Sequence, residues 1–240
     1  MYLKEWFNEL ANYIIPPTCV VCGRELLRYE KHMCLECFAG LPMTYFWKYQ
    51  DNSAEISFWG KVRIERVYSL FFYRGSYKKL LYSIKYKSNI RLCKYLGKAI
   101  GSKIAESLII SNDKIDYIIP VPLHFLKKWK RGFNQSEIIA KEICKELNNA
   151  TQKTQVINLL KRVRFTKTQT HKNKMERWKS VEHAFTTKNN FKKYTNSINN
   201  KHILIIDDVL TTGATIESCA NAILKKYNCR ISIATLAYVE

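Results

Sequence analysis

Apolar residues recur along this chain with two different spacings. An apolar run covers 202–206, which indicates a strand buried on both faces. Residues 62–73 are rich in β-branched and aromatic side chains, which also favours a strand. Within 77–86, the residues Leu80, Leu81 and Ile84 recur at helical spacing. By the same criteria we predict strands over 116–121 and 230–238, and helices over 92–108, 135–147 and 215–227.

Strands and helices alternate in this prediction after residue 61, an order typical of an α/β protein with a parallel sheet flanked by helices. The chain has 240 residues, of which 47% are hydrophobic and 25% charged, so it can bury such a sheet in a globular core. We therefore assign 61–240 to one α/β domain and 1–60 to a small separate module. The polar, basic segments 161–180 and 186–201 carry no clear periodicity, and no element is predicted there.

The small module is defined by its cysteines. Four of them form two C-x2-C pairs with 11 residues between the pairs: Cys19 with Cys22, and Cys34 with Cys37. Two such turns direct four thiolates at one point, which is the ligand set of a structural zinc site. In a cytoplasmic chain this interpretation is favoured over disulfides, with redox dithiols or iron–sulfur ligation as the alternatives. A closed four-cysteine site has no open coordination position, so it is expected to stabilise the module rather than to catalyse.

Charge is distributed unevenly along the chain. The net charge is +20, and 61–200 contains 31 Lys and Arg against 9 Asp and Glu, whereas 1–60 contains 5 against 7. A basic segment of this kind attracts nucleic acid, anionic lipid or a phosphorylated ligand. The alternative is an ordinary solvated, lysine-rich surface. No apolar run reaches the length of a transmembrane helix. Acids at Glu5 and Glu9 argue against a signal peptide, so we expect a cytoplasmic protein without a membrane span.

One motif follows the predicted strand 202–206 directly. Two acids, Asp207 and Asp208, stand at the carboxyl end of that strand, where open α/β sheets bind their ligands. A loop of small residues then enters a helix, and its N–H and hydroxyl groups are suited to a phosphate. The loop consists of Thr211, Thr212, Gly213, Ala214 and Thr215. Acids for ribose hydroxyls beside a phosphate loop predict a ribose-5-phosphate pocket, with a capped helix as the alternative. The motif resembles the signature loop of the type I phosphoribosyltransferase fold.

Two further segments narrow the resemblance. Residues 121–124 (VPLH) with 127–137 (KKWKRGFNQSE) are similar to the middle motif of the ComF family of competence-associated proteins. Gln169 and Thr170, with Arg177, Ala184 and Phe185 after them, resemble that family's third motif, while Ser180 replaces its usual Asn. The similarity covers roughly 15–240. It implies an N-terminal zinc ribbon joined to a phosphoribosyltransferase-like domain.

The resemblance also implies a ligand. Phosphoribosyl pyrophosphate, or a molecule of that shape, would place its ribose hydroxyls on Asp207 and Asp208, directly or through Mg²⁺. Its 5′-phosphate would lie in 211–215, and Arg131 would hold the pyrophosphate bidentately. The residues identify neither an acceptor nor a group that activates one, so catalysis stays open. An active phosphoribosyltransferase of nucleotide or base metabolism, without a DNA role, is the alternative function.

DNA uptake, together with other competence proteins as partners, is likewise implied by the resemblance. Basic residues interleaved with aromatic ones agree with single-stranded DNA as a partner, because such strands are held by cations and stacked on rings. The candidates are Lys127, Lys128, Trp129, Lys130, Arg131, Arg164 and Arg177. Tyr82 and Tyr86 lie one helical turn apart among lysines, and they either stack on bases or face the core.

Overall fold

The computed structural model describes residues 16–150, 153–163, 184–188 and 195–240. Its centre is a five-stranded sheet in the order β1-β7-β6-β2-β3, in which every neighbouring pair is parallel. The strands are β1 (Val67–Phe72), β2 (Tyr117–Pro120), β3 (Gln155–Val156), β6 (His202–Leu210) and β7 (Arg230–Tyr238). A separate antiparallel pair consists of β4 (Leu160–Arg162) and β5 (Phe185–Thr187). The predicted parallel α/β sheet is confirmed.

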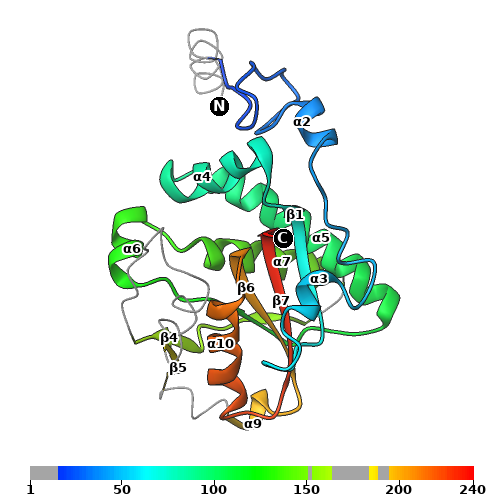
Figure 1. Ribbon diagram of the computed structural model, residues 1–240, viewed down its shortest axis with the longest axis vertical. Coiled ribbons are helices and arrows are strands. Elements are labelled where there is room, and N and C mark those ends of the chain that lie inside the picture. The colour runs from blue at the N-terminus through cyan, green and yellow to red at the C-terminus, as the bar shows by residue number, and fades with distance from the viewer. Residues whose placement is uncertain (1–15, 151–152, 164–183, 189–194) are drawn as a thin grey trace.

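Helices cover both faces of the sheet. Figure 1 shows α10 in front of the sheet and α5 with α7 behind it. The longer helices are α4 (Lys78–Tyr86), α5 (Ile90–Ser111), α6 (Phe125–Arg131), α7 (Gln135–Asn149) and α10 (Ala214–Leu224). The short ones are α2 (Leu35–Ala39), α3 (Ser53–Ile56), the 3₁₀ turn η1 (Gly75–Tyr77) and α9 (Thr195–Ile198). None of the described helices combines the length and apolar character needed to cross a membrane.

The central strand β6 is buried on both sides, as its apolar run predicts. Leu204 and Ile206 belong to the apolar cluster that α5 and α7 form with the sheet. Ile203 and Ile205 point the other way, into the cluster that contains the buried face of α10. All four side chains are fully buried. Alternate residues of a strand face opposite sides, so a strand between two helical layers must be apolar throughout.

β6 continues four residues beyond the end predicted at Ile206. The extension pairs with β7 as far as Leu210 and Tyr238, whereas β2 on the other side ends at Pro120, opposite Ile206. The last hydrogen bond on the β2 side runs from the Val121 N–H to the Ile206 carbonyl at 2.9 Å. From Asp207 onward β6 therefore has a strand neighbour on one side only, which opens a step at the carboxyl edge of the sheet.

Three elements lie in segments for which the sequence predicted no element. The strands β4 and β5 and the short helix α9 border or lie within the polar segments 161–180 and 186–201. The helix α6 also lies in a stretch, between Val121 and Gln135, for which no element was predicted. Its first turn is capped by the His124 ring, which accepts from the Leu126 N–H, and it ends at Gly132 in the left-handed region. Because α6 buries none of its residues, it has no apolar stripe from which a helix could be predicted.

α4 links the cysteine-rich segment to the rest of the protein. Cys19, Cys34 and Leu41 pack in the same apolar cluster as Leu80 and Leu81 of α4. Two hydrogen bonds add to this packing: the Lys79 ammonium donates to the Val21 carbonyl at 2.8 Å, and the Tyr77 hydroxyl donates to the Cys37 carbonyl at 3.2 Å. The position of α4 therefore depends on the cysteine-rich segment.

The contact between α5 and α7 needs a residue without a side chain at Gly101. A Cβ atom there would lie 3.0 Å from the Ile143 Cα atom and 3.1 Å from the Glu146 Cβ atom. We expect Gly101→Val to lower the free energy of unfolding by about 1–3 kcal/mol, because the helices would have to separate. The exposed Lys98→Val on the same helix is the control. Denaturant unfolding of both variants tests this, and equal midpoints would contradict it.

Candidate functional site

The acid pair lies at the step in the sheet edge. The Asp207 Oδ1 atom accepts from the Asp208 N–H at 2.9 Å and from the Ser136 hydroxyl at 3.2 Å. The Asp208 Oδ1 atom forms an ion pair with the Lys85 ammonium at 3.0 Å, and both side chains are largely buried. β6, α7 and α4 thus each contribute a side chain to one polar cluster.

The surroundings of the Asp207 carboxyl group change its pKa. Burial raises the pKa of Asp207 to about 7, and the neighbouring Asp208 carboxylate adds to the rise. The Asp208 N–H, the Lys85 ammonium and the Ser136 hydroxyl oppose this rise in pKa without cancelling it. The Asp207 carboxyl therefore changes charge near neutral pH, while Asp208 keeps a cation beside it.

The loop after β6 has the backbone that an anion site requires. Gly213 adopts φ +78° as the N-cap of α10, and no side chain among the described residues caps that helix. The first N–H groups of α10 are thus available to an anion, which the helix dipole also favours. A Cβ atom at Gly213 would lie 3.0 Å from two ring atoms of the buried Phe58. Glycine is required there both for its positive φ and for the space that it leaves to Phe58.

Cations from three elements surround the acids. Burial lowers the pKa of Lys127, and the charges of Arg162, Arg131 and Lys85 lower it further, while the Asp208 carboxylate opposes them. Burial also lowers the pKa of Arg162, against the Asp207 carboxylate. These couplings mean that α4, α6 and β4 direct positive charge at one place. Such a site attracts a polyanion, and the two carboxylates keep it from being uniformly positive.

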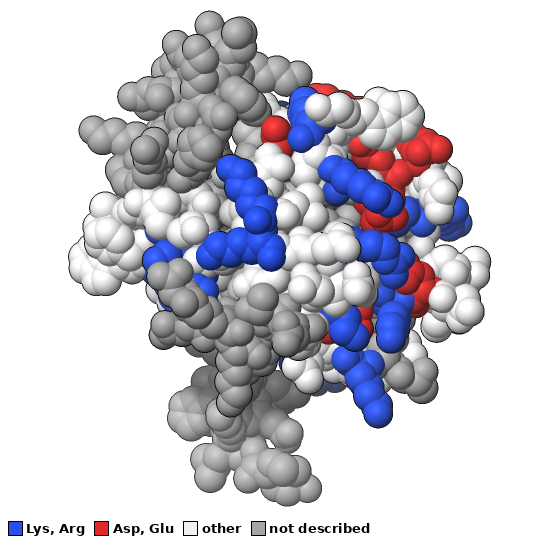
Figure 2. All heavy atoms as spheres, turned by 90° about the horizontal axis from the view of Figure 1, so that it is seen from below, with Lys and Arg blue, Asp and Glu red and all other residues white. Residues whose placement is uncertain are grey.

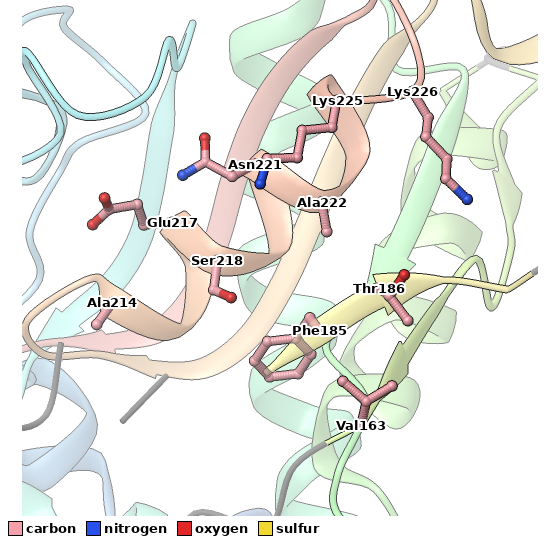
Figure 3. A pocket seen from close by; sticks show the side chains of 10 residues that line it. All are labelled: Val163, Phe185, Thr186, Ala214, Glu217, Ser218, Asn221, Ala222, Lys225 and Lys226. Atoms are coloured by element: carbon pink, nitrogen blue, oxygen red, sulfur yellow. The ribbon is translucent and has the colours of Figure 1, made fainter. Parts of the chain in front are cut away.

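A separate hollow lies along α10, between this helix and the β4–β5 pair (Figure 3). It has a volume of about 380 Å³ and is bordered by Phe185 and Val163 on one side and by Glu217, Ser218 and Asn221 on the other. Among the predicted site residues that the structure describes, only Ala214 borders it. The hollow is therefore distinct from the acid pair.

The structure places five of the seven residues predicted to bind nucleic acid on one helix. Lys127, Lys128, Trp129, Lys130 and Arg131 all lie on α6. The Trp129 side chain is 86% exposed, and the Lys128 ammonium lies 3.8 Å from the Glu137 carboxylate. The other two candidates, Arg164 and Arg177, lie outside the described residues.

The surroundings of three residues are decided only by the structure. Lys85 stood among the lysines that alternate with tyrosines, and its ion pair with Asp208 spans 123 positions of sequence, for which no local pattern gives a signal. Tyr82 and Tyr86 do not face the core: their rings are 55% and 64% exposed, with centroids 4.9 Å apart.

The four N-terminal cysteines form one cluster. All four sulfur atoms lie within 4.8 Å of one another, and the Cys22 and Cys34 sulfurs are 3.8 Å apart. A zinc–sulfur bond of about 2.3 Å puts the sulfurs of a tetrahedral site roughly 3.8 Å apart, so the residues fit zinc. Burial raises the pKa of the Cys19 thiol, but N–H groups of Cys22, Cys34 and Val21 outweigh it and bring that pKa to about 6. A thiolate is the form that binds metal.

Comparison with known proteins agrees with this architecture. Residues 101–240 match the phosphoribosyl transferase domain, and the chain belongs to that family. An adenine phosphoribosyltransferase structure from Leishmania tarentolae has 12% identity and a TM-score of 0.33, with 79% of this chain and 89% of that chain covered. That similarity is too low to support an argument.

Relatives narrow the family to proteins of the ComF type. Competence protein F of Haemophilus influenzae is 24% identical over 213 residues, covering 87% of this chain and 79% of that protein. Competence protein ComFC of Bacillus subtilis is 26% identical over 220 residues, with 90% and 82% covered. The DNA utilization protein YhgH of Escherichia coli K12 is 24% identical over 208 residues, with 86% and 84% covered. The resemblance to the ComF family is confirmed.

We expect about one zinc ion per chain in the freshly purified protein. Cys34→Ser should abolish zinc binding and lower the melting temperature, because binding of a structural metal contributes folding energy. Cys144→Ser is the matched control, because Cys144 lies outside the cluster. Its thiol donates a hydrogen bond to the Thr154 carbonyl, and a serine hydroxyl can donate the same bond. Metal analysis with thermal unfolding measures both effects. An unchanged zinc content in Cys34→Ser would refute the assignment.

The raised pKa of Asp207 predicts a pH-dependent stability. The folded state holds a proton that the unfolded chain releases near pH 4, so this group's contribution is complete below about pH 4 and is lost as the pH rises through about 7. Asp207→Asn removes the titration. We expect the free energy of unfolding of the variant, relative to wild type, to increase from about pH 5 to about pH 8. The exposed Glu106→Gln should show no such trend, and the same difference at every pH for Asp207→Asn would contradict the prediction.

Proposed function

We propose that this protein binds a phosphoribosyl ligand at the carboxyl edge of its sheet, with phosphoribosyl pyrophosphate as the probe of that class. The observation that carries the proposal is the acid pair at the step in β6, followed by the uncapped N-terminus of α10. The acid pair offers acceptors for vicinal hydroxyls, and the N-terminus of α10 offers N–H donors for a phosphate. The family match supports the same ligand class.

In this proposal the bound ligand replaces the ion pair between Lys85 and Asp208. The ribose hydroxyls bind Asp207 and Asp208, the 5′-phosphate binds 211–215, and the pyrophosphate meets the surrounding cations. Lys85 then exchanges the Asp208 carboxylate for a phosphate oxygen. Mg²⁺, if it accompanies the ligand, is held mainly by pyrophosphate and water, as is usual for that ion.

We further propose that the protein handles single-stranded DNA during DNA uptake in the cytoplasm. The printed names of its relatives, competence protein and DNA utilization protein, support this role. The net charge of +20 and the exposed aromatic side chains next to basic ones support the chemistry. A ligand site and a DNA surface then share the basic edge of the sheet.

Titration calorimetry with phosphoribosyl pyrophosphate and Mg²⁺ tests the ligand site. Asp208→Asn should weaken binding by at least about tenfold, because charged acceptors contribute about 1.5–3 kcal/mol per hydrogen bond. Glu106→Gln makes the same charge change on the exposed face of α5 and should bind like wild type. Gly213→Val is unsuitable, since the added side chain would meet Phe58. Absence of binding by wild type, or equal affinity in Asp208→Asn, would overturn the assignment.

A further inference from the structure

A groove runs between the cysteine-rich segment and the junction of α4 with α5. It has a volume of about 920 Å³. The residues around it come from 18–23, from α4 and from the turn that leads into α5, and they include Thr18, Cys19, Gly23, Lys79, Tyr82, Lys87, Asn89 and Arg91. Among the described residues that line it, three are cationic and none is an Asp or a Glu.

The basic residues of the groove differ in their ion pairing from those at the opposite edge of the sheet. Figure 2 shows the molecule from below, at the amino ends of the strands, where basic side chains are interspersed with acidic ones. There Arg230 binds Asp113 at 2.8 Å and Lys201 binds Asp116 at 3.2 Å. Within the described part of the chain, no carboxylate lies within ion-pair distance of Lys87 or Arg91. Among the described residues, the charges of Lys87 and Arg91 are therefore not neutralised by an ion pair.

Two aromatic rings continue the groove along α4. Tyr82 borders the groove, and its ring contacts the Tyr86 ring at a tilt of 39°. The guanidinium of Arg131 lies over the Tyr86 ring at 5.7 Å from its centroid, on the side of α6. The buried face of α4 consists of Leu80, Leu81, Ser83 and Ile84, so the tyrosines contribute little to the core. Such exposed rings between cations form a surface on which unpaired bases stack.

We propose that single-stranded DNA lies in this groove, with its phosphates on Lys87 and Arg91 and its bases on Tyr82 and Tyr86. The strand then continues toward Arg131 and α6. This inference rests on the DNA-handling part of the proposed function and locates it at a site other than the α6 residues that the sequence suggested. Single strands are preferred over duplex because only unpaired bases expose their faces to the tyrosine rings.

The cysteine-rich segment forms one wall of this site. Cys19 and Gly23 border the groove, and Lys79 spans it by donating to the Val21 carbonyl. The groove therefore depends on the cysteine-rich segment being folded, because that segment supplies one of its walls. Phosphoribosyl binding, by contrast, uses the other side of α4, through Lys85.

Fluorescence anisotropy with a labelled oligothymidylate at two salt concentrations tests the inference. Removing both cations, in Lys87→Ala/Arg91→Ala, should reduce the slope of log affinity against log salt by about 1.4, because each phosphate contact contributes roughly 0.7. Removing both rings, in Tyr82→Leu/Tyr86→Leu, should weaken binding at least about fivefold and leave the slope unchanged. Lys225→Ala/Lys226→Ala makes a matched charge change at the end of α10 and should behave like wild type.

Two further measurements separate this inference from the proposed function. Affinity for phosphoribosyl pyrophosphate should be unchanged in Lys87→Ala/Arg91→Ala and in Lys225→Ala/Lys226→Ala, which also shows that they are folded. The thermal unfolding midpoint serves as the folding control for Tyr82→Leu/Tyr86→Leu, because Tyr86 contacts Arg131. If wild type does not bind the oligonucleotide, the DNA part of the proposed function fails together with the groove. If wild type binds and only Ala substitution of Lys127, Lys128, Lys130 and Arg131 weakens binding, the groove is overturned and the proposed function stands. Equal affinity for a duplex would also overturn the stacking arrangement.

Discussion

The unequal lengths of β2 and β7 around the central strand determine where this protein places its chemistry. β7 follows β6 to its last residue, so the backbone of Asp207 and Asp208 is held in a strand. β2 stops opposite Ile206, which leaves the other side of the acids without a neighbouring strand. A fixed backbone with one open side lets side chains from α7 and α4 reach the carboxylates. The acids are thus rigid in position and still accessible to other groups.

Two adjacent acids in a largely enclosed site need partners that stabilise their negative charge. The partners of Asp207 and Asp208 differ. Lys85 neutralises Asp208, while Asp207 has N–H and hydroxyl donors but no ion pair among the described residues, and its pKa rises accordingly. Burial lowers the pKa of Lys127, and repulsion from the other cations at the same edge lowers it further. A site of this kind gains from a ligand that carries phosphates for the cations and hydroxyls for the acids.

α4 connects the two ends of the molecule that have recognisable motifs. One side of this helix binds the cysteine-rich segment through Lys79 and the packing of Leu80, and its last turn reaches Asp208 through Lys85. The exposed side carries Tyr82 and Tyr86, whose rings contact each other. The cysteine cluster and the acid pair are therefore linked through one short helix rather than through a flexible connection.

Local sequence patterns determined the sheet-and-helix alternation, the cysteine quartet and the loop 211–215, because each depends on residues close together in the chain. A strand buried on both faces must be apolar throughout, and paired thiolates need a fixed short spacing. Tertiary structure alone decided the true end of β6, because that end depends on how far β7 pairs with it. It also decided that Lys85 meets Asp208, that α6 is a helix without a buried face, and that Tyr82 and Tyr86 face outward. These features arise from contacts between distant segments, and a local pattern of hydrophobic and polar residues contains no information about which distant segments meet.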